Sequence, residues 1–121
     1  MAVREVLEEL GEVRGVEACA LVGEDGFVIE GMQRENAPEV DFLGGAATSA
    51  MASARALADH LQRGAVEEVM VEYPEGPILL VPLEVGESSY MLVTLLDSVQ
   101  SLGRVRFQLK RVVPRLREVL V

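Results

Sequence analysis

The spacing of apolar and polar positions along the chain predicts three helices. Over Ala2–Val13 apolar residues recur at helical spacing and glutamates occupy the opposite side, which is typical of a short amphipathic helix. A longer helix is predicted over Glu39–Arg63, because Gly64 follows it as a stop residue. A third is predicted over Ser101–Leu120, where Pro114 is expected to kink the helix or split it in two.

Five apolar or alternating segments between these helices predict strands. They are Val16–Val22, Phe27–Glu30, Val66–Tyr73, Ile78–Leu83 and Tyr90–Leu96. Short turns join most successive strands, so the predicted sheet is mainly antiparallel. The unbroken apolar run before Leu96 indicates a central strand, and Pro82 limits its strand to an edge or a strand end. The order helix, two strands, helix, three strands, helix predicts an α+β fold in one domain, 1–121.

The predicted central helix has two different sides. An apolar stripe that we expect to face the sheet consists of Val40, Leu43, Ala47, Ala50, Ala54, Leu57 and Leu61. The opposite side consists of Asp41, Gly45, Thr48, Ala52, Arg55, Ala56 and Asp59. Small residues dominate the middle of that second side, where a solvated face would carry long charged side chains. Such a surface lets another helix approach closely, and its side chains lose little entropy on contact.

Charge and hydropathy exclude several classes of partner. Acidic residues number 20 against 11 basic ones, a net charge of −9 that opposes binding to phosphate backbones, so no nucleic-acid role is predicted. No stretch approaches the roughly 18 apolar residues of a membrane helix, and no membrane insertion is expected. The first residues lack an apolar signal core, so we expect the mature chain to be the encoded one. A single cysteine fits a reducing, cytoplasmic location.

The last predicted helix departs from this acidic average. Its basic residues are Arg104, Arg106, Lys110, Arg111, Arg115 and Arg117, and its one acidic residue is Glu118. We interpret these cations as a charged outer helix face offset by the acidic remainder of the chain. An acidic protein surface, lipid headgroups or nucleic acid remain alternative partners for them.

No constellation for catalysis, metal binding or cofactor binding emerges from the sequence. With one cysteine, Cys19, and one histidine, His60, no structural zinc site and no nucleophile–base pair can be assembled. Cys19 is predicted to be a buried, small apolar residue. Gly44-Gly45 is not followed by the Gly-Lys-Ser/Thr of a phosphate-binding loop, so the chain is not expected to bind GTP itself. We therefore expect a protein that is not an enzyme.

Two features together resemble the roadblock/dynein light chain family, a branch of the profilin-like α/β/α sandwiches. The first is Gly-Val-Glu-Ala-Cys-Ala-Leu-Val at 15–22, followed by Asp-Gly-Phe-Val-Ile at 25–29. It is similar to the family's Gly-Val-x-Gly-Ala-x-Leu-Val followed by Asp-Gly and an apolar strand, with Ala18 where many relatives have glycine. The second is the small-residue helix followed by an alternating strand. The resemblance covers essentially the whole chain and implies helices on both faces of a five-stranded sheet.

The resemblance also implies a function. Members of this family are typically dimers in which the central helix and the following strand pair with their mates. Bacterial members resemble regulators of Ras-like small GTPases, including a gliding-motility type that stimulates a cell-polarity GTPase, and eukaryotic relatives are dynein light chains or scaffold subunits. This implies a homodimer that binds a Ras-like small GTPase and modulates GTP hydrolysis or nucleotide state. The alternative is a structural adaptor without effect on hydrolysis, and a third possibility is a ligand-sensing domain.

Carried onto this chain, the resemblance implies two sets of contact residues. The candidate partner-binding residues are Asp41, Gly45, Thr48, Ala52, Arg55 and Asp59. The candidate dimer-interface residues are Phe42, Ser49, Ala56, His60, Val66, Glu68, Met70 and Glu72. Arg55 is also the candidate for an arginine supplied in trans, because a guanidinium can neutralise charge that develops during phosphoryl transfer.

Overall fold

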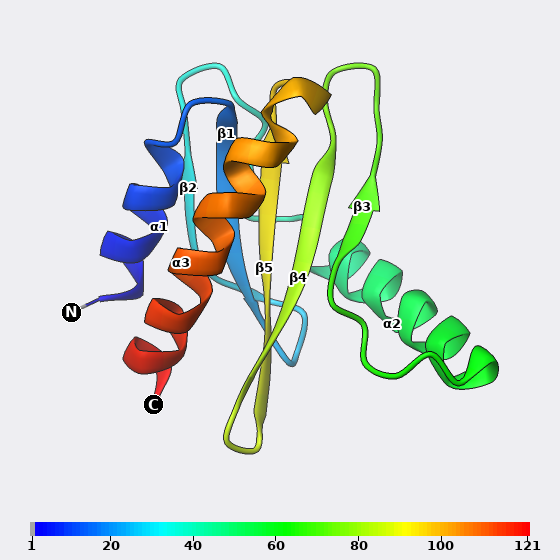
Figure 1. Ribbon diagram of the computed structural model, residues 1–121. Coiled ribbons are helices and arrows are strands. Elements are labelled where there is room, and N and C mark those ends of the chain that lie inside the picture. Colours follow the sequence, from blue (N-terminus) through cyan, green and yellow to red (C-terminus); the bar gives the residue numbers. More distant parts are fainter. Residues whose placement is uncertain (1) are drawn as a thin grey trace.

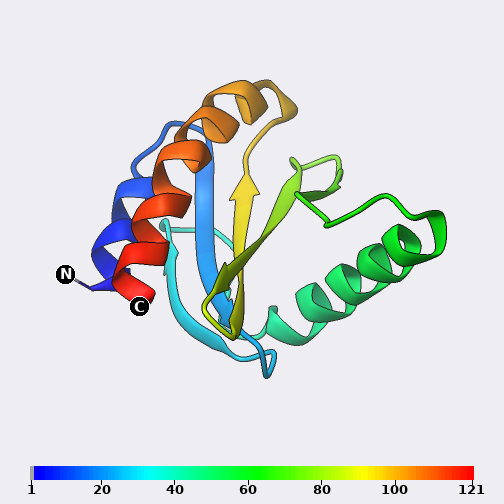
Figure 2. The same cartoon turned by 60° about the horizontal axis from the view of Figure 1, so that its bottom comes forward.

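A computed structural model describes residues 2–121 and places one five-stranded sheet between two layers of helix (Figures 1 and 2). The elements are α1 (Val3–Gly11), β1 (Val16–Gly23), β2 (Val28–Gln33), α2 (Gly44–Leu61), β3 (Val69–Val71), β4 (Ile78–Val85), β5 (Ser88–Leu96), a 3-10 turn (Val99–Ser101) and α3 (Leu102–Leu120). The strand order is β2-β1-β5-β4-β3, and every neighbouring pair is antiparallel. Helices α1 and α3 cover one face and α2 the other, which confirms the predicted sandwich.

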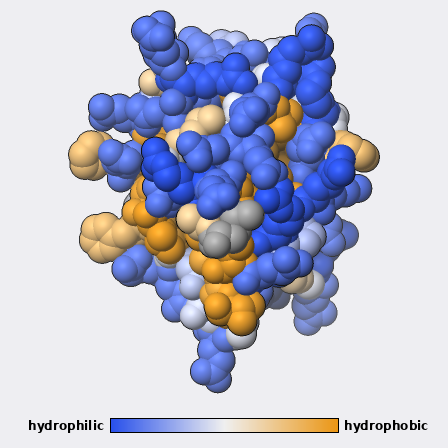
Figure 3. Space-filling view, turned by 90° about the vertical axis from the view of Figure 1, so that its left-hand side faces the viewer, coloured by the Kyte–Doolittle hydropathy of each residue, from blue (hydrophilic) through white to orange (hydrophobic). Residues whose placement is uncertain are grey.

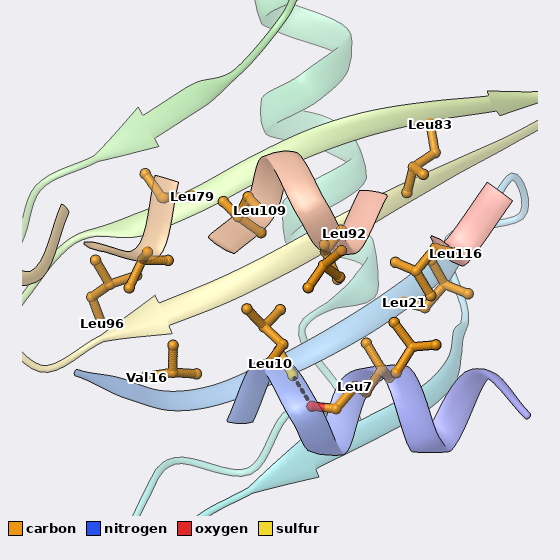
Figure 4. Packing of buried hydrophobic residues seen from close by; sticks show 14 residues of the cluster. Leu7, Leu10, Val16, Leu21, Leu79, Leu83, Leu92, Leu96, Leu109 and Leu116 are labelled. Atoms are coloured by element: carbon orange, nitrogen blue, oxygen red, sulfur yellow. Dashed lines mark hydrogen bonds between the residues drawn. The ribbon is translucent and has the colours of Figure 1, made fainter. Parts of the chain in front are cut away.

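The larger core lies between the sheet and the helix pair α1 and α3. Figure 4 shows Leu10 of α1, Leu21 of β1, Leu92 of β5 and Leu116 of α3 gathered in this layer. Central strand β5 is buried from Met91 to Leu96, as its apolar run predicts. The outward side of α1 is polar, and Figure 3 shows that charged and polar side chains cover most of this side of the molecule.

Helix α3 runs through Pro114 as one continuous helix, so the predicted split does not occur. Its stripe of Val105, Leu109, Val112 and Leu116 is buried on both sides of the proline. Packing of this stripe against the sheet holds the two halves of the helix together. This packing compensates for the loss of the backbone hydrogen bond that proline cannot donate.

The central helix is shorter than predicted, because α2 begins at Gly44 instead of Glu39. Val40 is buried against the sheet, and its backbone N–H donates to the Gln33 side chain at the end of β2, 3.1 Å away. These contacts hold the preceding segment against the sheet and keep it out of the helix. The helix ends at Leu61, because Gln62 already adopts a left-handed backbone conformation with φ 54°.

The edge strands also differ from their predicted lengths. Strand β3 comprises only Val69–Val71, where Val66–Tyr73 was predicted, because its ladder to β4 stops at Leu80. Pro82 lies in β4 just beyond that ladder, where its missing N–H leaves no β3 partner unsatisfied. The prediction that Pro82 limits its strand to an edge or a strand end is therefore wrong for β4 as a whole, which is an inner strand, and it holds only for the stretch around Pro82 that β3 does not reach.

Candidate functional site

Helix α2 is anchored to the sheet at its first residue. A Cβ atom added to Gly44 would lie 2.0 Å from the carbonyl oxygen of Gly26 in the β1–β2 turn, so only glycine permits this close approach. One and two turns further on, Ala47 and Met51 are buried against the sheet. The amino-terminal half of α2 is thus fixed by a backbone contact and a small core.

The carboxyl-terminal half of α2 diverges from the sheet (Figure 2). Leu57 and Leu61, which the periodicity places on the sheet-facing stripe, are 62% and 57% exposed. The prediction that the stripe is buried along its whole length is therefore wrong. A long, straight helix that is pinned at one end cannot follow the twist of the sheet at the other.

An apolar surface runs along one side of α2 and meets the sheet edge at Ala50. Ala50, Leu57 and Leu61 recur on one side of the helix. Ala50 also lines a hollow of about 140 Å³ together with Val71 of β3 and Tyr73, which is itself 52% exposed. We refer to Ala50, Leu57, Leu61, Val71 and Tyr73 as the α2–β3 surface. Because β3 is the last strand of the sheet, its outer backbone groups have no neighbouring strand among the residues that the structure describes.

The other flank of α2 borders a second hollow, of about 270 Å³, beneath Thr48, Ala52 and Arg55. The Thr48 hydroxyl is buried there and has no hydrogen-bond partner within residues 2–121. A guanidinium nitrogen of Arg55 lies 3.6 Å from a carboxylate oxygen of Glu84, and both side chains are largely exposed. This arrangement combines small residues, an unpaired hydroxyl and a positioned cation.

The structure divides the predicted partner-binding residues between different places. Thr48, Ala52 and Arg55 share the second hollow. Asp59 borders a neighbouring hollow near the end of α2. Gly45 is exposed on the helix, and Asp41 lies in the turn before it.

The predicted dimer-interface residues are also divided. Exposed positions before or along α2 are Phe42, Ser49, Ala56 and His60. Val66 packs against the smaller core, whereas Met70 pairs with Leu79 on the opposite face of the sheet. Glu68 is ion-paired to Arg106 at 2.6 Å, and Glu72 is exposed.

Sequence reasoning missed Leu57 and Leu61 as surface residues, because they match the apolar periodicity of a core stripe. Tyr73 belongs to the segment Val66–Tyr73, which the resemblance implies as the edge that extends the sheet. No signal in the pattern separates a stripe that meets its own sheet from one that projects beyond it.

The single thiol has no nucleophilic character. Cys19 is buried in β1, and its Sγ donates to the carbonyl oxygen of Leu7 at 3.4 Å. Burial raises the pKa of Cys19 to about 12, so the thiolate is not populated near neutral pH.

No three His, Cys, Asp or Glu side chains within the described part of the chain are arranged to hold a metal ion. None of the helices there combines the length and apolarity that a membrane crossing requires.

Comparison with known proteins agrees with this fold. The family model described as Roadblock/LC7 domain matches residues 2–96. "Uncharacterized protein MJ0310" of Methanocaldococcus jannaschii is 31% identical over 112 residues, 93% of this chain and 94% of that protein. Two solved structures are each 28% identical and cover 95% of this chain and 85% of theirs. They are the gliding protein MglB of Thermus thermophilus, with a TM-score of 0.75, and an MglB described as having a tetrameric arrangement, with a TM-score of 0.76. The chain therefore belongs to the Roadblock/LC7 domain family.

Proposed function

We propose that this protein is a non-catalytic homodimer that binds a Ras-like small GTPase and modulates its GTP hydrolysis or nucleotide state. The observation that carries this proposal is the α2–β3 surface beside a free strand edge, which a second copy of the chain can cover. Similarity to the gliding protein MglB and to an MglB in a tetrameric arrangement supports the choice of partner and the self-association.

Self-association would bury the side chains that a lone protomer exposes. Leu57 and Leu61 are exposed on the half of α2 that diverges from the sheet, and Tyr73 is exposed just after the edge strand β3. Pairing of β3 with its mate satisfies the free backbone groups, and pairing of the two α2 helices covers the leucines. Phe42, 87% exposed just before α2, adds apolar area next to the same helix.

The GTPase is assigned to the opposite flank of α2, which self-association through the α2–β3 surface leaves free. The hollow beneath Thr48, Ala52 and Arg55 can receive a side chain of the partner. Glu84 holds the Arg55 guanidinium at the rim of that hollow, where it can meet an acidic group or a phosphate.

The test is GTP turnover by the Ras-like GTPase of the same organism, with and without a molar excess of this protein. A parallel titration compares the GTPase loaded with a GTP analogue or with GDP. Faster turnover with preference for the GTP form supports the proposal. Binding without a change in turnover identifies a structural adaptor instead, and absence of binding to both forms refutes the assignment of a GTPase partner.

Substitutions separate the two surfaces. Leu57→Asp is expected to shift the protein to a monomer in sedimentation velocity, since it places a charge on the surface assigned to self-association. Phe107→Asp is the matched control, because Phe107 is 60% exposed on α3, across the sheet from α2. An unchanged dimer for Leu57→Asp, or a wild-type monomer, contradicts the interface.

Ala52→Arg and Arg55→Ala examine the GTPase flank. Ala52→Arg fills the hollow with a long charged side chain, so binding of the GTPase is expected to fall while the dimer persists. Arg55→Ala is expected to lower the effect on turnover, and Arg63→Ala, at an exposed arginine after α2, serves as its control. Full retention of binding by Ala52→Arg overturns the placement of the GTPase on this flank.

A further inference from the structure

A further hollow lies on the opposite face of the sheet from α2, in a groove between α3 and the segment that enters β3. Its volume is about 460 Å³. Helix α3 crosses the sheet and leaves the part toward β3 uncovered (Figure 1). Four apolar residues line the groove: Val81 of β4 and Leu109, Val113 and Pro114 of α3. We name this feature the α3 groove.

Cations of α3 border this apolar lining. Arg106, Lys110 and Arg117 line the α3 groove, and Glu67 and Glu68 line it from the segment before β3. Arg106 is neutralised by Glu68, with which it shares two hydrogen bonds to Oε2 at 2.6 and 3.2 Å. Lys110 and Arg117 have no ion-pair partner within residues 2–121. Glu67 is likewise unpaired among the described residues, so two free cations stand against one free carboxylate and the groove keeps a net positive charge.

The charge distribution of the whole chain favours an acidic ligand at α3. Helix α3 carries six of the 11 basic residues and one of the 20 acidic ones, whereas the rest of the chain carries five basic residues against 19 acidic ones. An acidic ligand is repelled by most of the molecular surface and attracted to α3. The remaining cations of α3 are already engaged: Arg115 with Glu9, Arg104 with the Arg14 carbonyl, and Arg111 over the Phe107 ring.

Pro114 leaves one carbonyl of α3 without its usual helical donor. Because proline has no N–H, it cannot donate to the carbonyl of Lys110 four residues earlier, and both residues line the groove. Along the helix, Arg106 and Arg117 are separated by about 16 Å at 1.5 Å per residue. A helix of about 11 residues, or a shorter extended segment, matches this length.

We infer that the α3 groove is a docking site for a short acidic segment of a partner protein, with apolar side chains on Val81, Leu109 and Val113 and carboxylates on Lys110 and Arg117. The apolar lining and Lys110 belong to this groove alone, whereas Arg117 also borders the hollow near Asp59 at the end of α2, so Lys110 is the residue that separates this site from the proposed α2 contacts. A nucleic acid or a lipid headgroup fits less well, since the apolar lining offers nothing to a phosphate.

The experiment is a selection on the intact protein from a displayed library of random peptides about 12 residues long, a length chosen to span the groove. Enriched peptides are expected to combine Asp or Glu with Leu, Ile or Phe. The affinity of each, measured by fluorescence anisotropy, is expected to fall as the salt concentration rises from about 50 to 500 mM, because salt screens the ion pairs. Amide resonances of α3 and β4 are expected to shift on binding.

Matched variants locate the site. Lys110→Glu is expected to weaken binding at least about fivefold at low salt, and Lys110→Glu with Arg117→Glu at least about thirtyfold, by turning attraction into repulsion. Arg14→Glu changes the net charge equally at an exposed position outside the groove and is expected to leave the affinity within about twofold.

Several outcomes overturn the inference: no enrichment, enrichment of neutral or basic peptides, or equal affinity for the Lys110→Glu and Arg14→Glu proteins. Binding of anionic vesicles or of a DNA oligonucleotide in place of the peptides also refutes it and assigns the groove to those ligands. Sedimentation and GTP turnover of the Lys110→Glu protein are expected to match wild type, so loss of peptide binding is distinguishable from failure of the proposed GTPase function.

Discussion

Gly44→Ala tests the contact that positions α2 and with it both proposed interfaces. The added Cβ would lie 2.0 Å from the Gly26 carbonyl oxygen and 3.0 Å from its carbon, so the backbones must separate by about 1 Å to reach a tolerable distance. The groups that clash are main-chain atoms, which cannot rotate away. The start of α2 must therefore lift, and the burial of Ala47 and Met51 behind it decreases.

The magnitude follows from comparison with the next residue. Gly45→Ala adds the same methyl group where no atom lies within 4 Å, and it gains up to about 1 kcal/mol of helix propensity. Gly44→Ala gains the same propensity term but incurs an overpacking cost of about 1–3 kcal/mol. The free energy of unfolding of Gly44→Ala is thus expected to be about 1–3 kcal/mol below that of Gly45→Ala.

The assay is urea unfolding followed by far-UV circular dichroism. All variants are compared at one protomer concentration, because association contributes to apparent stability. Sedimentation velocity at the same concentration is expected to show weaker self-association for Gly44→Ala, since α2 has moved. Equal unfolding free energies for the two alanine variants would refute the anchoring role of Gly44.

Three further predictions concern buried or constrained groups. Burial raises the pKa of Cys19 to about 12, whereas an unfolded thiol titrates near 9, so the unfolded state loses its proton first and stability is expected to fall as pH rises from about 9 to 12. Cys19→Ala is expected to remove this contribution, which is at most about 1.4 kcal/mol per pH unit, and identical pH slopes in urea unfolding would contradict it. Thr94→Val is expected to raise the free energy of unfolding by up to about 1 kcal/mol, because it removes a buried hydroxyl that has no hydrogen-bond partner among the described residues. If calorimetry shows instead that the free energy of unfolding falls by about 1 kcal/mol or more, the hydroxyl is hydrogen-bonded. Pro114→Ala is expected to stabilise the protein by about 1–3 kcal/mol, since alanine can donate to the Lys110 carbonyl inside α3, and an unchanged unfolding midpoint would indicate that this carbonyl is already bonded.

Much of the fold follows from local pattern. The apolar run that ends at Leu96 predicts the central strand, and the periodicity through Val105 and Leu116 predicts the helix that covers it. These predictions hold because burial on one or both faces imposes a repeat on the sequence itself. Boundaries were less predictable: α2 starts five residues later than its pattern indicates, since Val40 is held by the sheet and by the Gln33 side chain.

The sequence predicted some of the residues of the candidate site, but not how they are arranged. Thr48, Ala52 and Arg55 were selected from the small-residue side of α2, and the structure brings them to one hollow. The exposure of the leucines in the α2–β3 surface was not predicted. Leu57 has the same periodic spacing whether it packs against its own sheet or against a partner. The α3 cations were visible as a charged face, but the apolar groove beside them was not.

The sequence by itself determined the order and type of the elements, the acidic balance of the chain and the contrast with its basic last helix, because each is a property of residues close together along the chain. Only the tertiary structure decided where α2 leaves the sheet, which leucines remain uncovered and which cations of α3 are left without a carboxylate. These features depend on a backbone approach at Gly44 and on ion pairs such as Arg115 with Glu9 and Arg106 with Glu68. Residues far apart in the chain meet only after folding, so a local pattern carries no record of their contact.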